Sequence, residues 1–187
     1  MLMLKKLVKL LIILSLPFDA AFAADIPIIV IAPSKKAQSV STVGTSVVIY
    51  DENNINSSTD YFLGDVLNFG SPSLNGYQSG GYGTTSGIQL RSLPKRYSTV
   101  YIDGIKMSDP GMLSNDYYFD DLLKSQISRV EILKGNQSSI YGSGAMGGTI
   151  NITTKRGKPG IQKFFSANTG SNSIYNIAAS IAGADEK

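Results

Sequence analysis

The order of apolar and polar residues predicts a chain built mainly of short β-strands. The run Thr149 to Thr154, TINITT, alternates apolar with polar positions and is rich in β-branched residues, which is typical of a strand with one buried face. Asp103-Gly104 directly follows another such run and predicts a hairpin turn. The other predicted strands are Val47 to Tyr50, Ile88 to Arg91, Ser98 to Ile102 and Arg129 to Leu133.

One longer segment has the periodicity of a helix. Between Asn56 and Asn68 the apolar residues recur at intervals of three and four, which would place them on one face. Ser57 or Ser58 is expected to cap its start, with Asp60 in the first turn. Gly70-Ser71-Pro72 is expected to end it, and a short helical turn is predicted over Phe119 to Gln126.

Two loops separate the predicted strands. Asn75 to Gly87, NGYQSGGYGTTSG, is either a flexible linker or an exposed recognition loop, where tyrosine supplies contact area at low entropic cost. The second loop, Lys106 to Tyr118, contains Asp109, Asn115 and Asp116. These lack the spacing of a calcium-binding loop, so we interpret them as solvated loop residues.

The C-terminal part has a different pattern. After Gly157 to Gly160, the runs IQKFFSANTG and SIYNIAASIAG alternate in part and are joined by a turn at Gly170-Ser171-Asn172. Alternation over about 10 residues is typical of a transmembrane β-strand. Two ordinary hairpin strands would give the same pattern, so both interpretations stay open.

The N-terminus predicts export. Lys5, Lys6 and Lys9 precede an apolar run, Leu10 to Leu16, and the small residues around Ala23 form a cleavage site. The run is too short to span a bilayer, although a membrane anchor is the alternative. We expect residues 1–23 to be a signal peptide.

Charge and composition narrow the function classes. The signal holds three of the 17 basic and one of the 14 acidic residues, which leaves 14 and 13 in the rest of the chain. This balance provides no basic patch for nucleic acid. The chain has no Cys and no His, so Ser-His and Cys-His nucleophile systems are excluded within it, and zinc or copper would lack its usual ligands.

The glycines of YGSGAMGG have two interpretations. Gly142, Gly144 and Gly147 have the G-x-G-x-x-G spacing of a dinucleotide-binding loop, but such a loop opens a helix that holds the pyrophosphate. Here a predicted strand follows, and no Lys-Ser or Lys-Thr is present to make a P-loop. We therefore favour a turn between strands, with the nucleotide-dependent enzyme as a remote alternative.

The segment Ile127 to Gly157, ISRVEILKGNQSSIYGSGAMGGTINITTKRG, resembles the plug signature of TonB-dependent outer-membrane receptors. The blocks TVYIDGIKM and IQLRSL resemble two further parts of that family, and the likeness runs from about Val43 to Arg156. It is nearest to the cobalamin and ferric-siderophore transporters. The resemblance implies an α+β fold, in which a small mixed-sheet plug domain with short helices precedes the first one or two strands of a transmembrane β-barrel. It also implies an outer-membrane location, no enzymatic activity and no cofactor.

The resemblance gives the segment IPIIVIAP the position of a TonB box. Such a box is a short extended peptide that the periplasmic domain of TonB adds as a strand, and a plain N-terminal strand of the plug is the alternative. The candidate residues are Ile26, Pro27, Ile28, Ile29, Val30, Ile31 and Ala32.

The resemblance also suggests ligand contacts. Plug loops at the outer mouth touch the metal chelate or corrinoid in this family. The candidate residues are Tyr77, Tyr82, Met107, Met112 and Tyr117.

Contacts between plug and barrel are expected at Arg91, Arg129, Glu131 and Lys134. The family commonly has Arg-Gly-Pro where this chain has Lys134-Gly135-Asn136, and a lysine lacks the bidentate fork of arginine. It also has Arg-Gly where this chain has Arg91-Ser92.

The resemblance also implies a role for glycine in the conformation of the backbone. Five glycines are expected to let the chain turn sharply and let backbones pack closely. They are Gly135, Gly142, Gly144, Gly147 and Gly148.

The resulting division of the chain is a signal peptide (1–23), a TonB box with linker (24–42), a plug domain (43–157) and the start of a barrel (158–187). A barrel of this family needs about 22 strands, far more than the last part can supply. The sequence is therefore expected to be a fragment, a truncated gene product or one piece of a split reading frame. A stand-alone periplasmic plug-like module is the alternative function.

Overall fold

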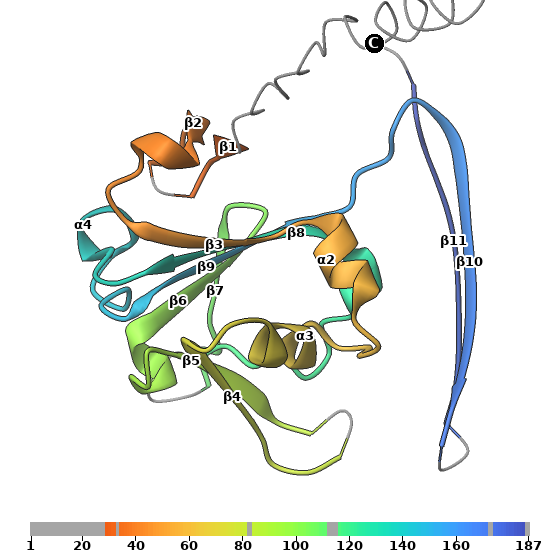
Figure 1. The fold of residues 1–187 in the computed structure, drawn as a ribbon, viewed down its shortest axis with the longest axis horizontal. Helices are drawn as coiled ribbons and strands as arrows, with labels where there is room; N and C mark the ends of the chain where they lie inside the picture. The colour runs from red at the N-terminus through yellow and green to blue at the C-terminus, as the bar shows by residue number, and fades with distance from the viewer. Residues whose placement is uncertain (1–28, 33, 82–83, 112–115, 172–173, 186–187) are drawn as a thin grey trace, which may run out of the picture.

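The computed structural model of the chain describes residues 29–32, 34–81, 84–111, 116–171 and 174–185. A five-stranded sheet forms its centre (Figure 1), in the order β3-β8-β9-β6-β7. The strands are β3 (Ser46–Tyr50), β6 (Ser98–Ile102), β7 (Ile105–Met107), β8 (Ile127–Lys134) and β9 (Gly148–Thr154). β6 and β9 are parallel and the other neighbours are antiparallel, so the predicted mixed sheet of an α+β fold is confirmed.

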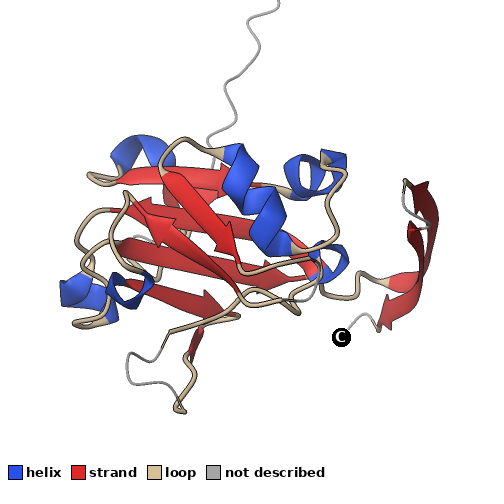
Figure 2. Ribbon diagram, turned by 90° about the horizontal axis from the view of Figure 1, so that it is seen from below, coloured by secondary structure: helices blue, strands red, loops and turns tan. Residues whose placement is uncertain are grey.

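One face of this sheet carries the main hydrophobic core. The helices α2 (Glu52–Ser57) and α3 (Leu63–Gly70) supply Ile55, Leu63 and Leu67, whose side chains are fully buried. They pack in one cluster with alternate residues of β8 and β9, namely Val130, Ile132, Ile150 and Ile152. The alternation seen in TINITT therefore divides a buried face from a second face. In Figure 2 one of the helices crosses in front of the strands.

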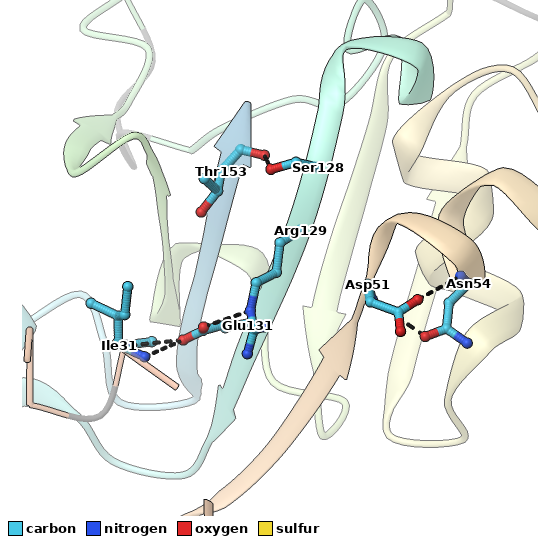
Figure 3. Close-up of polar contacts among 8 residues, drawn as sticks. Ile31, Asp51, Asn54, Ser128, Arg129, Glu131 and Thr153 are labelled. Atoms are coloured by element: carbon cyan, nitrogen blue, oxygen red, sulfur yellow. Dashed lines mark hydrogen bonds and ion pairs between the residues drawn. The ribbon is translucent and has the colours of Figure 1, made fainter. Parts of the chain in front are cut away.

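The predicted helix over Asn56 to Asn68 is wrong at its start. The chain instead forms α2, which ends at Ser57, and α3, which begins at Leu63. Asp51 caps α2, because its side chain accepts the N–H of Asn54 at 2.8 Å while the Asn54 side chain accepts the N–H of Asp51 at 3.3 Å (Figure 3). This reciprocal cap starts a helix upstream of the expected one, and the predicted end at Gly70 is confirmed.

Two small hairpins flank the sheet. β4 (Leu74–Gln78) and β5 (Ser86–Leu90) pair along their length, so both ends of the predicted loop over Asn75 to Gly87 are strand. The ring of Tyr77 covers Gly87, where a Cβ atom would lie 2.6 Å from it. β1 (Ile29–Val30) pairs with β2 (Gln38–Ser39) at the other end of the molecule (Figure 1).

The C-terminal hairpin stands beside the sheet (Figures 1 and 2). β10 (Gly160–Gly170) and β11 (Ile174–Ala184) are paired from end to end, which confirms the two predicted strands. Asn172 of the predicted turn lies outside the described residues. By their register, one side carries apolar residues that are 71 to 78% exposed, namely Ile161, Phe165, Tyr175, Ile177 and Ile181. Gln162, Ser166, Asn176 and Ser180 lie on the other side. Across the described residues, no helix is long and apolar enough to cross a membrane.

The glycine segment leads into a strand. β9 begins at Gly148 and no helix follows the G-x-G-x-x-G residues, which overturns the dinucleotide alternative. Gly148 has φ +147° and is paired on both sides, with Lys134 and with Ser98. A Cβ atom there would lie 2.2 Å from the carbonyl oxygen of Leu133. Gly142, with φ +87°, turns the chain after the short helix α4 (Ser138–Tyr141). Glycine therefore serves backbone geometry.

Replacing Gly148 by alanine is expected to destabilise the fold by about 2–4 kcal/mol. The added methyl group would overlap the Leu133 carbonyl in a backbone that pairing on both sides prevents from moving. Urea unfolding measures the change. Gly44→Ala is the matched control, because nothing lies within 4 Å of its Cβ position, and it should stay within about 0.5 kcal/mol. Equal effects of the two substitutions would contradict this account.

Replacing Ser92 by glycine is expected to stabilise the fold by about 1 kcal/mol. Arg91 and Ser92 are consecutive residues with positive φ, +55° and +62°, and glycine adopts that conformation without the steric cost of a Cβ atom. The midpoint of urea unfolding should rise for Ser92→Gly. It should not rise for Ser92→Ala, which keeps the Cβ atom, and a rise in both would show that strain is not the cause.

Candidate functional site

The second face of the sheet carries a polar and aromatic surface. Glu131, Asn151 and Tyr101 lie side by side across β8, β9 and β6, as the strand register requires. Residues 29–32, which we call the N-terminal segment, lie against this face. Val30 and Ala32 of the segment are buried, whereas Ile31 between them is 57% exposed.

Glu131 holds this segment by its backbone. Its Oε2 accepts the N–H of Ile31 at 3.0 Å and the N–H of Ala32 at 2.8 Å, and its Oε1 accepts from Nε of Arg129 at 2.8 Å (Figure 3). The side chain of Glu131 is only 6% exposed. A charge buried to this degree is stable only with such partners. The N-terminal segment and Arg129 together therefore compensate the negative charge of the Glu131 carboxylate.

Tyr141 supplies a second anchor. Its hydroxyl donates to the carbonyl oxygen of Ala32, and burial raises the pKa of this hydroxyl. The ammonium group of Lys35 lies 5.2 Å from the centroid of the Tyr141 ring and 6.0 Å from that of Tyr101, within range of a cation–π interaction. We call the side chains of Glu131 and Tyr141 the Glu131 clamp.

Only some of the TonB-box candidates lie among the residues that the structure describes. Ile26, Pro27 and Ile28 lie outside the described residues. Ile29 and Val30 form β1, and Ile31 and Ala32 follow on the clamp. The contact of Ile31 with Glu131 joins residues 100 positions apart, and no sequence signal pointed to it. The role of the segment as a TonB box stays a prediction.

A second polar cluster surrounds Lys95. Its Nζ lies 3.2 Å from Oδ2 of Asp116 and 3.7 Å from the centroid of the Tyr118 ring. Burial disfavours the charged ammonium, but hydrogen bonds to Tyr118, Tyr77 and Asp116 outweigh this and raise the pKa of Lys95. An open cavity of about 390 Å³ lies beside it, lined by Tyr77, Gln89, Pro94, Lys95, Arg96 and Asp116.

The predicted ligand contacts divide into three groups. Tyr77 lines the cavity and is 39% exposed. Met107 and Tyr117 instead pack against the main core, and the Tyr117 ring lies 5.0 Å from that of Phe119. Tyr82 and Met112 lie outside the described residues. Sequence reasoning missed Lys95 and Tyr118, because three separate segments bring the cluster together and no motif marks it. It interpreted Asp116 as a solvated loop residue, which is wrong, since Asp116 is buried and paired with Lys95.

Three of the predicted plug–barrel residues lie in β8, and the fourth directly follows β5. Arg129 and Glu131 bind each other within β8, a pairing that the sequence did not predict. Lys134 ends β8, and Arg91 follows β5 with an exposed side chain. Their contact with a barrel stays a prediction.

The other glycines tighten the connection between β8 and β9. Gly147 donates its N–H to the carbonyl of Tyr97 at 2.7 Å and accepts from the N–H of Gly135 at 3.0 Å. A Cβ atom on Gly144 would lie 3.2 Å from the Thr99 side chain. The predicted close backbone packing is therefore observed at Gly147.

Comparison with known protein families and solved structures gives matches that agree with one another. A sequence model described as "TonB-dependent Receptor Plug Domain" matches residues 39–149. The ferric yersiniabactin uptake receptor FyuA of Yersinia pestis is 24% identical, with 75% of this chain and 22% of that chain covered and a TM-score of 0.60. The alcaligin outer-membrane receptor FauA of Bordetella pertussis is 21% identical, with 82% and 26% covered and a TM-score of 0.67.

A third solved structure has the same fold. FpvA of Pseudomonas aeruginosa, described in complex with heterologous pyoverdines and iron, is 18% identical, with 83% of this chain and 20% of that chain covered and a TM-score of 0.68. The chain thus spans 20 to 26% of the length of these three proteins.

The family match covers more than half of the chain, and the observed fold agrees with it. FauA is described as an outer-membrane receptor, which agrees with the location that the sequence predicted. The chain belongs to the TonB-dependent receptor plug domain family.

Proposed function

We propose that the chain forms the plug of a TonB-dependent outer-membrane transporter and gates energy-coupled uptake of a ferric siderophore. The observation that carries the proposal is the plug-domain match over residues 39–149. Structures of the same fold are described as receptors for ferric yersiniabactin and for ferripyoverdine. These descriptions favour an iron chelate over a corrinoid.

The arrangement of the plug supports a gating role. The N-terminal segment lies at one end of the molecule and the β4–β5 hairpin at the opposite end (Figure 1). A gate that is opened from the periplasm needs its coupling segment and its ligand loops on different sides. In this proposal the segment faces TonB, and the loops near β4–β5 face the ligand.

The Lys95 cluster fits an anionic chelate. Two cations, Lys95 and Arg96, one anion, Asp116, and the ring of Tyr77 line its cavity. Because Asp116 pairs with Lys95, one positive charge remains in excess. The raised pKa of Lys95 keeps its ammonium charged near neutral pH. Cations next to aromatic faces bind oxygen-rich, negatively charged ligands through charge-assisted hydrogen bonds.

The C-terminal hairpin supports the proposed barrel. Strands of 11 residues match the length that crosses a bilayer at a tilt. One side is mainly apolar, although it carries Lys163, and suits lipid, whereas the other side is more polar, although it carries Phe164, and suits a lumen that holds a plug. Within the described chain, β10 and β11 form a sheet only with each other. Lipid does not tolerate unpaired strand edges, so we infer that further strands complete the wall.

Deleting residues 26–32 from the receptor that contains this chain is expected to abolish uptake of its ferric siderophore and to leave binding intact. The deletion removes the peptide that TonB would add as a strand and does not touch the ligand end. Uptake of radioactive iron and binding to whole cells measure the two effects. Binding is the control for correct folding, and persistent uptake would refute the TonB-box assignment.

Replacing Lys95 by methionine is expected to weaken binding of the ferric siderophore about tenfold, because a hydrogen bond from a charged donor is lost. Lys106→Met is the matched control, since Lys106 is an exposed lysine outside the cavity. Titration calorimetry on the receptor measures both affinities. Unchanged affinity for Lys95→Met would exclude the cavity as a ligand contact.

A further inference from the structure

We propose that the base of the C-terminal hairpin binds the phosphate of an anionic phospholipid headgroup through Lys158 and Lys163. The inference rests on the proposed membrane-spanning role of β10 and β11 and adds a lipid site to it. It is carried by a cationic groove at the base of the hairpin and by a lysine on the mainly apolar side of the hairpin.

The groove lies between the plug and the hairpin, beside the segment that connects β9 with β10. Its volume is about 830 Å³, within the usual range of ligand-binding clefts. Four cations line it, Lys155, Arg156, Lys158 and Lys163, against one described carboxylate, that of Glu52. We call this cavity the base groove. The base of the hairpin lies at the same end of the molecule as the N-terminal segment (Figure 1), which faces the periplasm in the proposed function.

The positive charge of the C-terminal part is concentrated in the base groove. Residues 132–184 contain five basic residues and no acidic one. Four of the five line the base groove, and the fifth, Lys134, lies at the end of β8. Like charges in one groove repel one another, so a bound anion would stabilise this arrangement.

Two of the four cations already interact with carboxylates of the plug. The ammonium group of Lys155 lies 3.1 Å from Oε1 of Glu52. The pKa of Asp103 is lowered chiefly by hydrogen bonds from Thr154, and the positive charge of Arg156 contributes to this shift. Lys155 and Arg156 are therefore balanced, at least in part, from within the chain.

The other two cations, Lys158 and Lys163, have no ion pair among the residues that the structure describes. Both are exposed. Ala184, the last residue of β11, donates its N–H to the carbonyl oxygen of Lys158 at 3.2 Å. Asp185 follows Ala184, but no described ion pair joins its carboxylate to Lys158. These two ammonium groups are available to an anion from outside the described chain.

Lys163 lies on the side of the hairpin that suits lipid. By the register of β10, it shares that side with Ile161, Phe165 and its cross-strand partner Ile181, which are 71 to 78% exposed. A lysine there is costly in the middle of a bilayer but nearly neutral at the membrane surface, where its long side chain reaches the headgroups. Lys163 therefore needs an anionic group at the membrane surface.

The hairpin has the length to place Lys163 near one membrane surface. Tyr175 lies on the same side of the hairpin, toward the turn, and pairs with Thr169, six positions after Lys163. Six residues of a strand span about 20 Å, and the apolar band of a transmembrane barrel is about 25 Å tall. Tyrosine is enriched at membrane surfaces, so Tyr175 suits the opposite surface.

A phospholipid headgroup fits both observations together. Its phosphate carries the negative charge that the base groove lacks, and it lies at the level that Lys163 can reach. A free anion would satisfy the groove but would leave a lysine on the lipid side unexplained. Basic residues near a membrane surface each strengthen binding to anionic lipid.

Binding to vesicles tests the site. The chain is purified in mild detergent and mixed with vesicles of phosphatidylcholine, or with vesicles in which one lipid in three is phosphatidylglycerol, and sedimentation measures the bound fraction. Lys158→Gln and Lys163→Gln are each expected to weaken binding to the anionic vesicles about fivefold, because each removes one cation near the surface. Binding to the neutral vesicles should not fall in either variant.

Two controls make the result specific to the headgroup. Lys106→Gln should bind like the unchanged chain, because Lys106 is an exposed lysine of β7 outside the base groove. An equal loss in Lys106→Gln would show attraction by net charge alone and overturn the site. Inorganic phosphate should displace the chain no more than sodium chloride at the same ionic strength. Stronger displacement would show a site for free phosphate and overturn the lipid assignment.

The neutral vesicles separate this proposal from the proposed function. If both lysine variants bind anionic vesicles as the unchanged chain does, with binding to neutral vesicles intact, the headgroup site alone is refuted. If the chain binds neither kind of vesicle, the membrane-spanning hairpin is refuted and the lipid site with it.

Discussion

The pairing of β9 with β8 on one side and β6 on the other is the constraint on which the rest of the structure depends. It requires a glycine at position 148, because the Leu133 carbonyl occupies the space of any Cβ atom. Once β9 is set, its alternation assigns Ile150 and Ile152 to the main core and Asn151 to the second face. That second face, next to Glu131, receives the N-terminal segment.

The two faces of the sheet therefore have different physical roles. The core face is apolar, covered by α2 and α3, and stabilised by burial. The other face binds the segment through hydrogen bonds to a buried carboxylate and a tyrosine hydroxyl, and through burial of Val30 and Ala32. Ala32 packs there in a second, smaller apolar cluster with Leu133, Tyr141 and Ala145.

The sequence predicted those strands and turns that a local pattern of residues determines. Alternation in TINITT and the Asp103-Gly104 turn predicted β9 and the hairpin of β6 and β7, and the C-terminal alternation predicted β10 and β11. It failed where side chains decide locally, as at the reciprocal cap of Asp51 and Asn54, which starts a helix that periodicity did not reveal. It also failed where the chain folds back over long distances. The clamp joins segments about 100 positions apart, and the Lys95 cluster joins loops without a motif.

A structure of the chain bound to the periplasmic domain of TonB would test the central claim most directly. The account predicts residues 26–32 as an extended strand in the TonB sheet. A complex in which TonB is bound while these residues lie outside its sheet would contradict it.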